Sequence, residues 1–136
     1  MSDVAVDKRI LSFLEKQTNL ILATARRDGS PQLSPVWYLW KDGAFVISTN
    51  TRTAKWWNLK KDPRCSVCVD EPATGQMVVA YGEADLDDGD VWDTTWKLVA
   101  KYRQLEEVQG HMDEIFTGQQ RVLITVRPRK LIPRNL

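Results

Sequence analysis

The residues best suited to chemistry in this 136-residue chain gather in one basic, hydroxyl-rich stretch, residues 48–63. An apolar run, residues 44–47, leads into small hydroxyl side chains around Arg52 and Lys55, and a short helix is predicted to follow. Free N–H groups at a helix start carry partial positive charge, and Arg or Lys completes the neutralisation of a phosphate. The pattern therefore predicts an anion site, although an ordinary helix start capped by Thr51 or Thr53 would carry the same residues.

No hydrolytic or nucleotide-binding motif accompanies this stretch. The sequence has no Gly-x-Ser-x-Gly elbow, no Walker lysine loop and no Rossmann glycine fingerprint. Cys65 and Cys68 lie an odd number of positions apart on a predicted strand, so their side chains face opposite sides and are expected to be structural thiols rather than metal ligands. Tyr81 and His111 can donate protons, but neither has a nominated partner. Any catalysis is therefore expected to depend on a bound cofactor.

Composition limits the classes of partner. Hydrophobic residues make up 43% and charged residues 27% of the chain, as in a globular protein, and its length predicts a single domain over residues 1–136. Nineteen Lys and Arg against eighteen Asp and Glu give a formal net charge of +1, which argues against nucleic acid or an anionic membrane as the main partner. The N-terminus resembles no secretory signal, and no apolar run reaches the ~18 residues of a membrane helix. A cytoplasmic location is expected.

Hydrophobic periodicity and turn signals predict a mainly β fold with flanking helices. The predicted strands are residues 20–26, 32–40, 44–49, 65–69, 77–85 and 121–126. Asp28-Gly29 and Asp42-Gly43 are hairpin turns between the first three of them. Six strands joined mostly by hairpins predict a small, six-stranded antiparallel split β-barrel, because closure removes exposed edges.

Several residues within these elements have a specific structural expectation. Pro35 cannot donate to a strand ladder, so it should lie at an edge or a bulge, and Gly82 should mark a bulge or a bend. Apolar spacing predicts helices near residues 6–14 and 92–102, with a short helix between Gly110 and Gly118. Residues 127–136 are expected to form a basic tail interrupted by prolines.

The pair Trp56-Trp57 falls within the predicted short helix after residue 53. Neighbours on a helix point about 100° apart, so the two indoles cannot share one narrow core stripe. One of them is expected to face a ligand, a second subunit or solvent. The alternative is a core wide enough to hold both.

Four segments, taken in order, resemble the pyridoxamine 5'-phosphate oxidase-like superfamily of FMN-binding split barrels. They are residues 22–38, 47–64, 82–84 and 121–128, which together span nearly the whole chain. More narrowly, they resemble its branch of flavin- or deazaflavin (coenzyme F420)-dependent oxidoreductases. The resemblance implies a homodimer with the cofactor in a groove between subunits. The C-terminal substrate signature of the oxidases themselves has no match here, so that particular activity is not implied.

The resemblance also implies roles for particular residues. The cofactor phosphate would be held by Lys55, with help from the neighbouring side chains Thr49, Arg52 and Thr53. The ring would lie against the second strand, at Ser34, Pro35, Val36 and Trp37. Some deazaflavin-binding relatives have a basic residue where this chain has Thr53. The resemblance implies F420 as the cofactor with FMN as the alternative, and the departure at Thr53 leaves both open.

The activity implied by the resemblance is hydride transfer between bound F420, or FMN, and a small organic substrate, with no catalytic protein residue assigned. A rival interpretation is a non-catalytic protein that binds or stores flavin, F420 or haem on the same barrel. A structural dimer without a cofactor is the third. Phosphate anchoring serves the first two equally, so the sequence does not separate them.

Overall fold

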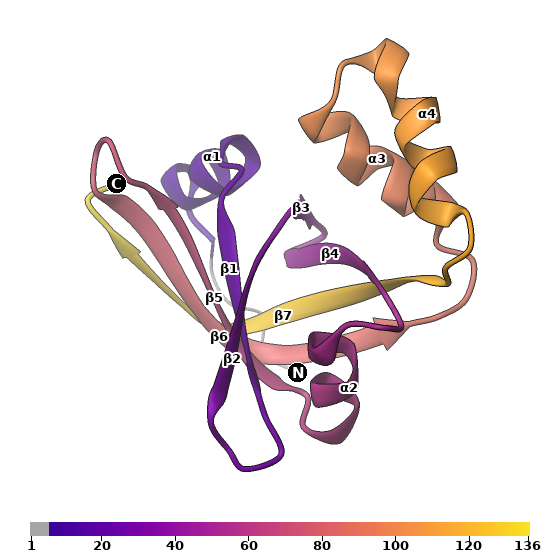
Figure 1. Cartoon of the computed structure of the whole chain (residues 1–136). Helices are drawn as coiled ribbons and strands as arrows, with labels where there is room; N and C mark the ends of the chain where they lie inside the picture. The colour runs from indigo at the N-terminus through magenta and orange to yellow at the C-terminus, as the bar shows by residue number, and fades with distance from the viewer. Residues whose placement is uncertain (1–5) are drawn as a thin grey trace.

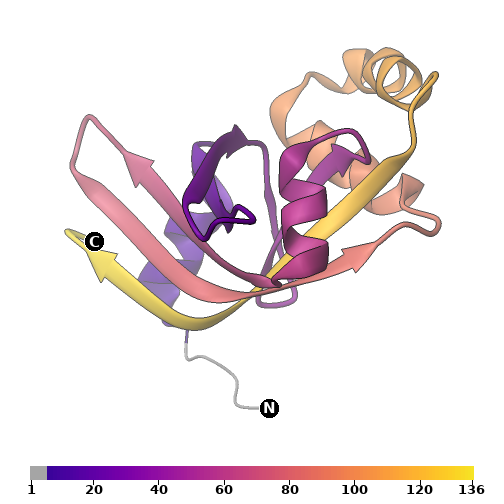
Figure 2. The ribbon, with the colours of Figure 1, turned by 60° about the horizontal axis from the view of Figure 1, so that its bottom comes forward.

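A computed structural model describes residues 6–136 as one curved sheet with flanking helices (Figure 1). In chain order the elements are α1 (Lys8–Lys16), β1 (Leu20–Ala25), β2 (Pro31–Val36), β3 (Leu39–Lys41), β4 (Ala44–Asn50), α2 (Ala54–Lys61), β5 (Arg64–Glu71), β6 (Gln76–Asp87), α3 (Trp92–Tyr102), α4 (Leu105–Phe116) and β7 (Arg121–Arg134). The helices α3 and α4 form a hairpin at one end of the sheet, whereas α2 lies on the concave side of the bent strands β6 and β7 (Figure 2).

The strands form an antiparallel split barrel, which confirms the predicted fold class. Within the described residues the sheet has seven strands in the order β2-β1-β5-β6-β7-β4-β3, and every pair is antiparallel. The two edge strands, β2 and β3, are consecutive in the chain. The chain therefore passes directly from one edge of the curled sheet to the other.

The predicted count of six strands was wrong because residues 32–40 form two strands rather than one. The break falls at Trp37 and Tyr38. There the backbone N–H of Tyr38 donates to the hydroxyl of Tyr102 at 3.0 Å, and its carbonyl accepts from Nζ of Lys101 at 3.2 Å. Side chains from α3 thus satisfy peptide groups that a neighbouring strand would otherwise bond.

The turn and edge predictions are confirmed. β1 pairs with β2 and β3 with β4 as hairpins. The turns contain Gly29 (φ 87°) and the pair Asp42 (φ 53°) and Gly43 (φ 77°), backbone angles that glycine and aspartate tolerate best. Pro35 lies on the edge strand β2, where a missing N–H does not interrupt a second ladder.

The predicted tail at residues 127–136 was wrong, because β7 continues to Arg134 and pairs with β6 as far as Met77. Its pairing with β4 ends at Val126, so beyond that residue β7 has a strand on one side alone. Pro128 and Pro133 therefore lie where an N–H is not needed on both sides. Pro128 stands opposite Gly82, beside a shift in register that confirms the bulge expected at that glycine.

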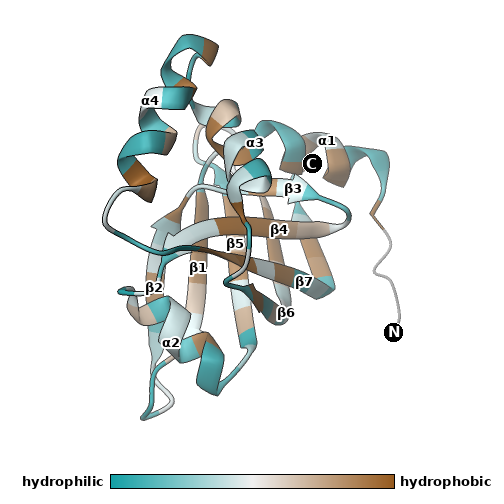
Figure 3. Ribbon diagram, turned by 90° about the vertical axis from the view of Figure 1, so that its right-hand side faces the viewer, coloured by the Kyte–Doolittle hydropathy of each residue, from teal (hydrophilic) through white to brown (hydrophobic). Residues whose placement is uncertain are grey.

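The core lies inside the curl of the sheet and under α1 and α2. Apolar residues are concentrated along the strands, whereas much of α2 and α4 is hydrophilic (Figure 3). In α1 the residues Ile10, Phe13 and Leu14 are buried, as their spacing predicts. Within the described residues, none of the helices combines the length and apolar character that a membrane span requires.

The tryptophan pair and the cysteines divide between inside and outside, as the sequence predicts. Trp56 is buried in the core, while Trp57 is 53% exposed and donates to the carbonyl of Thr51. Cys65 faces the core and Cys68 the opposite face of β5. Burial raises the pKa of the Cys65 thiol to about 12, as expected for an unreactive structural thiol.

The helical hairpin is only partly as predicted. The helix expected near residues 92–102 is α3, but α4 begins at Leu105 and runs through Gly110. Glu107 stabilises this earlier start, because its side chain accepts from the backbone N–H of Gln104 in a capping box. The hairpin packs over β3, β4 and the start of β7, and this positions the site described next.

Candidate functional site

A pocket of about 310 Å³ lies between the split edge of the barrel and the α3–α4 hairpin. Its lining combines an apolar wall with two cationic side chains. The lining residues come from every element around the split, namely Pro35, Val36, Trp37, Ser48, Lys55, Leu98, Val99, His111, Ile115 and Arg121. We call it the anion pocket, for the charges described below.

Arg121 is held in place by strand pairing. Ser48 on β4 stands opposite Leu123 on β7, which brings the diagonal neighbour Arg121 within reach. One terminal nitrogen of Arg121 donates to Oγ of Ser48 at 2.7 Å, and the other donates to Oε1 of Gln119 at 3.3 Å. Its Nε is buried and has no acceptor among residues 6–136. The guanidinium is therefore fixed but keeps an unused donor.

Lys55 enters the same pocket from the first turn of α2 and is half-buried. Burial, and secondarily the charge of Arg121, lowers the pKa of Lys55 below its ordinary value. Burial likewise lowers the pKa of Arg121. No Asp or Glu lines the pocket, and neither cation forms an ion pair within the part of the chain that the structure describes. A bound anion would neutralise both charges.

An aromatic stack built on Trp37 forms the wall beside these charges. Its ring lies 4.4 Å from that of Tyr102, with planes 3° apart, and 5.3 Å from that of His111. The guanidinium carbon of Arg103 lies 4.7 Å from the Trp37 ring. Residues of α3 and α4 pack against Trp37, which lines the anion pocket.

The structure brings half of the residues predicted for the cofactor together. Lys55, Pro35, Val36 and Trp37 all line the anion pocket. The remaining predicted residues do not line it and bond elsewhere, namely Ser34, Thr49, Arg52 and Thr53.

Their own contacts are specific. Ser34 accepts from Gln32, and the hydroxyls of Thr49 and Thr53 bond to each other at 3.1 Å. Arg52 is exposed and donates to the carbonyl of Gly118 at 3.2 Å. Although Thr53 is the N-cap residue of α2, its side chain makes no capping bond. Direct contacts of these four residues with a cofactor stay predictions.

The sequence did not identify Arg121 as a site residue, and it placed Ser48 only at the start of the hydroxyl-rich stretch, without a role of its own. Both lie in predicted strands, and their meeting depends on the β4–β7 pairing, which joins residues 73 positions apart. The usable signal was the alternation of β4, which sends Ser48 and Thr49 to opposite faces. His111, considered only as a proton donor, lies in the same pocket.

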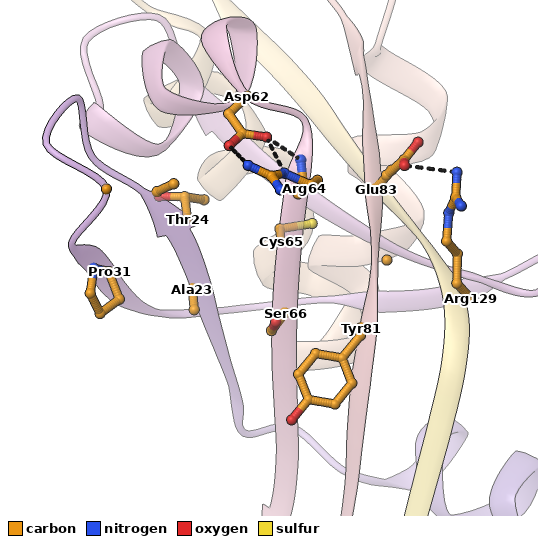
Figure 4. A pocket seen from close by; sticks show the side chains of 13 residues that line it. Ala23, Thr24, Pro31, Asp62, Arg64, Cys65, Ser66, Tyr81, Glu83 and Arg129 are labelled. Carbon is orange, nitrogen blue, oxygen red and sulfur yellow. Dashed lines mark hydrogen bonds and ion pairs between the residues drawn. The ribbon is translucent and has the colours of Figure 1, made fainter.

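A second hollow, of about 500 Å³, lies over β1, β5 and β6 (Figure 4). Its charges are already paired. Arg64 bonds to Asp62 at 2.8 Å, and Arg129 to Glu83 at 2.7 Å. Tyr81 stands in the same hollow and not in the anion pocket. This hollow therefore offers no uncompensated charge for a phosphate.

The chain belongs to a known family. It matches the family described as Pyridoxamine 5'-phosphate oxidase over residues 6–131, which confirms the family resemblance. A pyridoxine/pyridoxamine 5'-phosphate oxidase from Acidothermus cellulolyticus is 36% identical over 69 residues. That segment is 51% of this chain and 31% of the relative, so the chain spans about a third of that protein's length.

Solved structures with the same fold carry different names. A protein described as an F420 reductase has a TM-score of 0.74 and 24% identity, over 93% of this chain and 98% of its own. HutZ, the heme storage protein from Vibrio cholerae, has a TM-score of 0.71 and 17% identity, over 95% of this chain and 94% of its own. At these identities the likeness establishes the fold.

Proposed function

We propose that the chain binds a phosphate-bearing redox cofactor, F420 or alternatively FMN, in the anion pocket and acts as an oxidoreductase on a small organic substrate. The observation that carries this proposal is the pair Lys55 and Arg121, two half-buried cations without a carboxylate partner among residues 6–136. Such an arrangement is destabilising unless a ligand supplies the opposite charge. The shared fold with an F420 reductase supports the choice of cofactor class.

The chain's own residues would bind and orient the cofactor. Lys55 and Arg121 hold the phosphate, and Ser48 fixes the guanidinium of Arg121 for that contact. The segment from Pro35 to Trp37 gives the ring a flat apolar wall. The bound ring would supply hydride transfer to or from the substrate. The hairpin residues Leu98, Val99 and Ile115 cover the pocket and reduce the access of water to it.

Replacing Lys55 with alanine is expected to weaken binding of F420 or FMN by about 1.5 to 3 kcal/mol, the usual contribution of a hydrogen bond to a charged group. Titration of both cofactors side by side, followed by fluorescence or absorbance, measures the change and identifies the preferred cofactor. Lys61→Ala is the matched control, because Lys61 is exposed at the other end of the same helix. A Lys55→Ala titration curve identical to that of the wild type would remove Lys55 from the anchor.

We further propose that the chain forms a homodimer through the outer face of β2, β1 and β6, with the cofactor groove between subunits. Large apolar side chains are exposed on that face: Leu33 is 64%, Tyr81 50% and Ile21 37% exposed. Leu33 lies on an edge strand opposite Ala23. Such a face is typical of an interaction surface.

The dimer interface can be tested with one charge. Leu33→Lys is expected to shift the chain from dimer to monomer, because it places an ammonium group in the apolar interface. Size-exclusion chromatography with light scattering gives the mass. Leu105→Lys is the control, since Leu105 is 76% exposed on α4 and lies outside this face. A wild-type chain that elutes as a monomer at micromolar concentration would contradict the shared groove.

A non-catalytic haem- or cofactor-binding role is the second candidate, and one observation favours it. His111 lies in the anion pocket, where an imidazole can ligate haem iron and the two cations can pair with acidic groups. Turnover separates the two roles. Oxidation of reduced F420 by a panel of enones and nitro compounds above background supports the oxidoreductase, whereas tight binding without turnover supports storage.

A further inference from the structure

Lys101, on α3, is a second half-buried cation outside the anion pocket. Its Nζ donates to the carbonyl of Tyr38 at 3.2 Å and lies 3.7 Å from the centroid of the Tyr38 ring. It makes no ion pair with any residue of the described chain, residues 6–136. Burial lowers the pKa of this ammonium group to about 8. A half-buried ammonium group lowers the stability of the fold, whereas an apolar side chain in the same place would not.

Tyr102 bonds to the same backbone residue as Lys101, so the break does not depend on Lys101 alone. The hydroxyl of Tyr102 accepts from the backbone N–H of Tyr38 at 3.0 Å, and it can donate to the carbonyl of Thr18 at 3.0 Å or to that of Tyr38 at 3.3 Å. Tyr102 therefore already holds the break between β2 and β3. Of the three N–H groups that an ammonium group carries, Lys101 uses one for the carbonyl of Tyr38. The ammonium group also lies against the Tyr38 ring, 3.7 Å from its centroid, which leaves at most one N–H for a ligand.

Lys101 lines a pocket of about 600 Å³ beside the β2–β3 break. The apolar part of its lining consists of Leu20, Ile21, Pro35, Val36 and Trp37. The polar part consists of Thr18, Asn19, Asp70, Lys101 and Tyr102. We call it the Lys101 pocket. It shares Pro35, Val36 and Trp37 with the anion pocket. A ligand in the Lys101 pocket would thus lie next to one anchored at Lys55 and Arg121.

The shape and chemistry of the lining indicate the class of that ligand. Trp37 and Tyr102, which stack on each other, line the pocket together with Val36, and an aromatic or conjugated body can pack against such rings edge to face. The ammonium group of Lys101 is suited to an oxyanion at one end of it. Asp70, also in the lining, would repel that oxyanion and so favours its placement at Lys101.

We propose that the Lys101 pocket binds an aromatic or conjugated carboxylic acid as its anion, with Lys101 as the specificity-determining residue. The role of that acid as the substrate rests on the function proposed above. Its binding does not, because neither Lys55 nor Arg121 lines the Lys101 pocket. The two proposals can therefore fail separately.

The test is a titration of the 136-residue chain with cinnamate, a planar conjugated carboxylate, and with cinnamamide, its uncharged analogue. Chemical shifts of the ¹⁵N-labelled chain report both the dissociation constant and the location, through the indole N–H of Trp37. Cinnamate is expected to bind at least tenfold more tightly than cinnamamide, because a charge-assisted hydrogen bond contributes at least that factor. Lys101→Met should remove the difference.

Lys97→Met is the matched control, since Lys97 lies exposed one turn earlier on the same helix, and it should leave both affinities unchanged. A pH series on the wild type tests the same point without mutation. Cinnamate affinity should fall as pH rises through about 8, whereas cinnamamide affinity should not. The tyrosines that face Lys101, Tyr38 and Tyr102, both have raised pKa values and stay neutral there, and Asp70 is the carboxyl group in the lining.

Three outcomes would overturn the proposal. They are no saturable cinnamate binding, equal affinities for the acid and the amide, and unchanged cinnamate affinity in folded Lys101→Met. The cofactor titration of Lys55→Ala contains no cinnamate, and the cinnamate titration contains no cofactor. A failure of one therefore leaves the other result intact.

Discussion

Alanine at position 82 is expected to lower the free energy of unfolding by about 3 kcal/mol, the upper part of the range for overpacking a core. Gly82 is buried on β6 opposite Pro128, beside the register shift between β6 and β7. The added Cβ would lie 2.8 Å from the carbonyl carbon of Arg127, and closer still to its oxygen. These are backbone atoms, so no side-chain rotation relieves the overlap. Chemical denaturation followed by circular dichroism measures the loss.

Gly110→Ala is the matched control and should change stability in the opposite direction. Gly110 is exposed within α4, and a Cβ added there would have no other heavy atom within 4 Å. Alanine is favoured over glycine inside a helix by about 0.5 to 1 kcal/mol, so this variant should be slightly more stable. Wild-type stability in Gly82→Ala would mean that the close approach of β6 and β7 does not exist in the folded chain.

The parts of the fold that were predictable depend on contacts close in the sequence. The pairs Asp28-Gly29 and Asp42-Gly43 specify tight turns, and the apolar alternation around them specifies the strands they join. Gly82 signalled a bulge by its position inside a strand. These signals require no knowledge of which strands lie next to each other.

The parts that were not predictable depend on distant partners. β7 continues past Pro128 because β6 pairs with it there and β4 does not, and neither fact is visible in residues 127–136. The strand around Trp37 breaks because Lys101 and Tyr102 on α3 bond to the backbone of Tyr38, some 64 positions earlier. The sequence pattern around Trp37 contains no information about bonds to residues so far along the chain.

In the anion pocket, too, one residue could be predicted from its neighbours in the sequence and another could not. Lys55 could be identified from its local surroundings, since a basic residue in the first turn of a helix after a hydroxyl-rich loop is a recognisable anion signal. Its partner Arg121 is brought to the pocket by the pairing of β4 with β7, and its local sequence indicates only a strand residue. Arg52, which looked equivalent to Lys55 in the sequence, points to Gly118 instead.

Removing both cations of the anion pocket should weaken cofactor binding by about 3 to 6 kcal/mol, since each would make a hydrogen bond to the phosphate worth about 1.5 to 3 kcal/mol. The double variant is Lys55→Met with Arg121→Met. Because both charges act on one phosphate, the single variants need not add to the double one, and a double-mutant cycle gives their coupling. Titration with F420 and FMN measures all four proteins.

Stability should change in the opposite direction to binding. Lys55 makes no hydrogen bond or ion pair within the described chain, and its lowered pKa reflects burial beside Arg121. Lys55→Met should therefore raise the free energy of unfolding without cofactor by roughly 0.5 kcal/mol, a small gain because solvent screens a half-exposed charge. Arg121→Met also loses the bonds to Ser48 and Gln119, which offset its gain.

This opposition of sign is what distinguishes a ligand site from a structural cluster. If Lys55 and Arg121 served the fold, their removal would lower stability and binding together. Arg52→Met completes the set, because Arg52 belongs to the phosphate anchor predicted from the sequence but does not line the pocket. If Arg52→Met weakens binding as much as Arg121→Met does, the phosphate lies near Arg52, just before the N-terminus of α2. A clear loss in Arg121→Met with a smaller one in Arg52→Met would place it between β4, β7 and α2, where the charges lack partners.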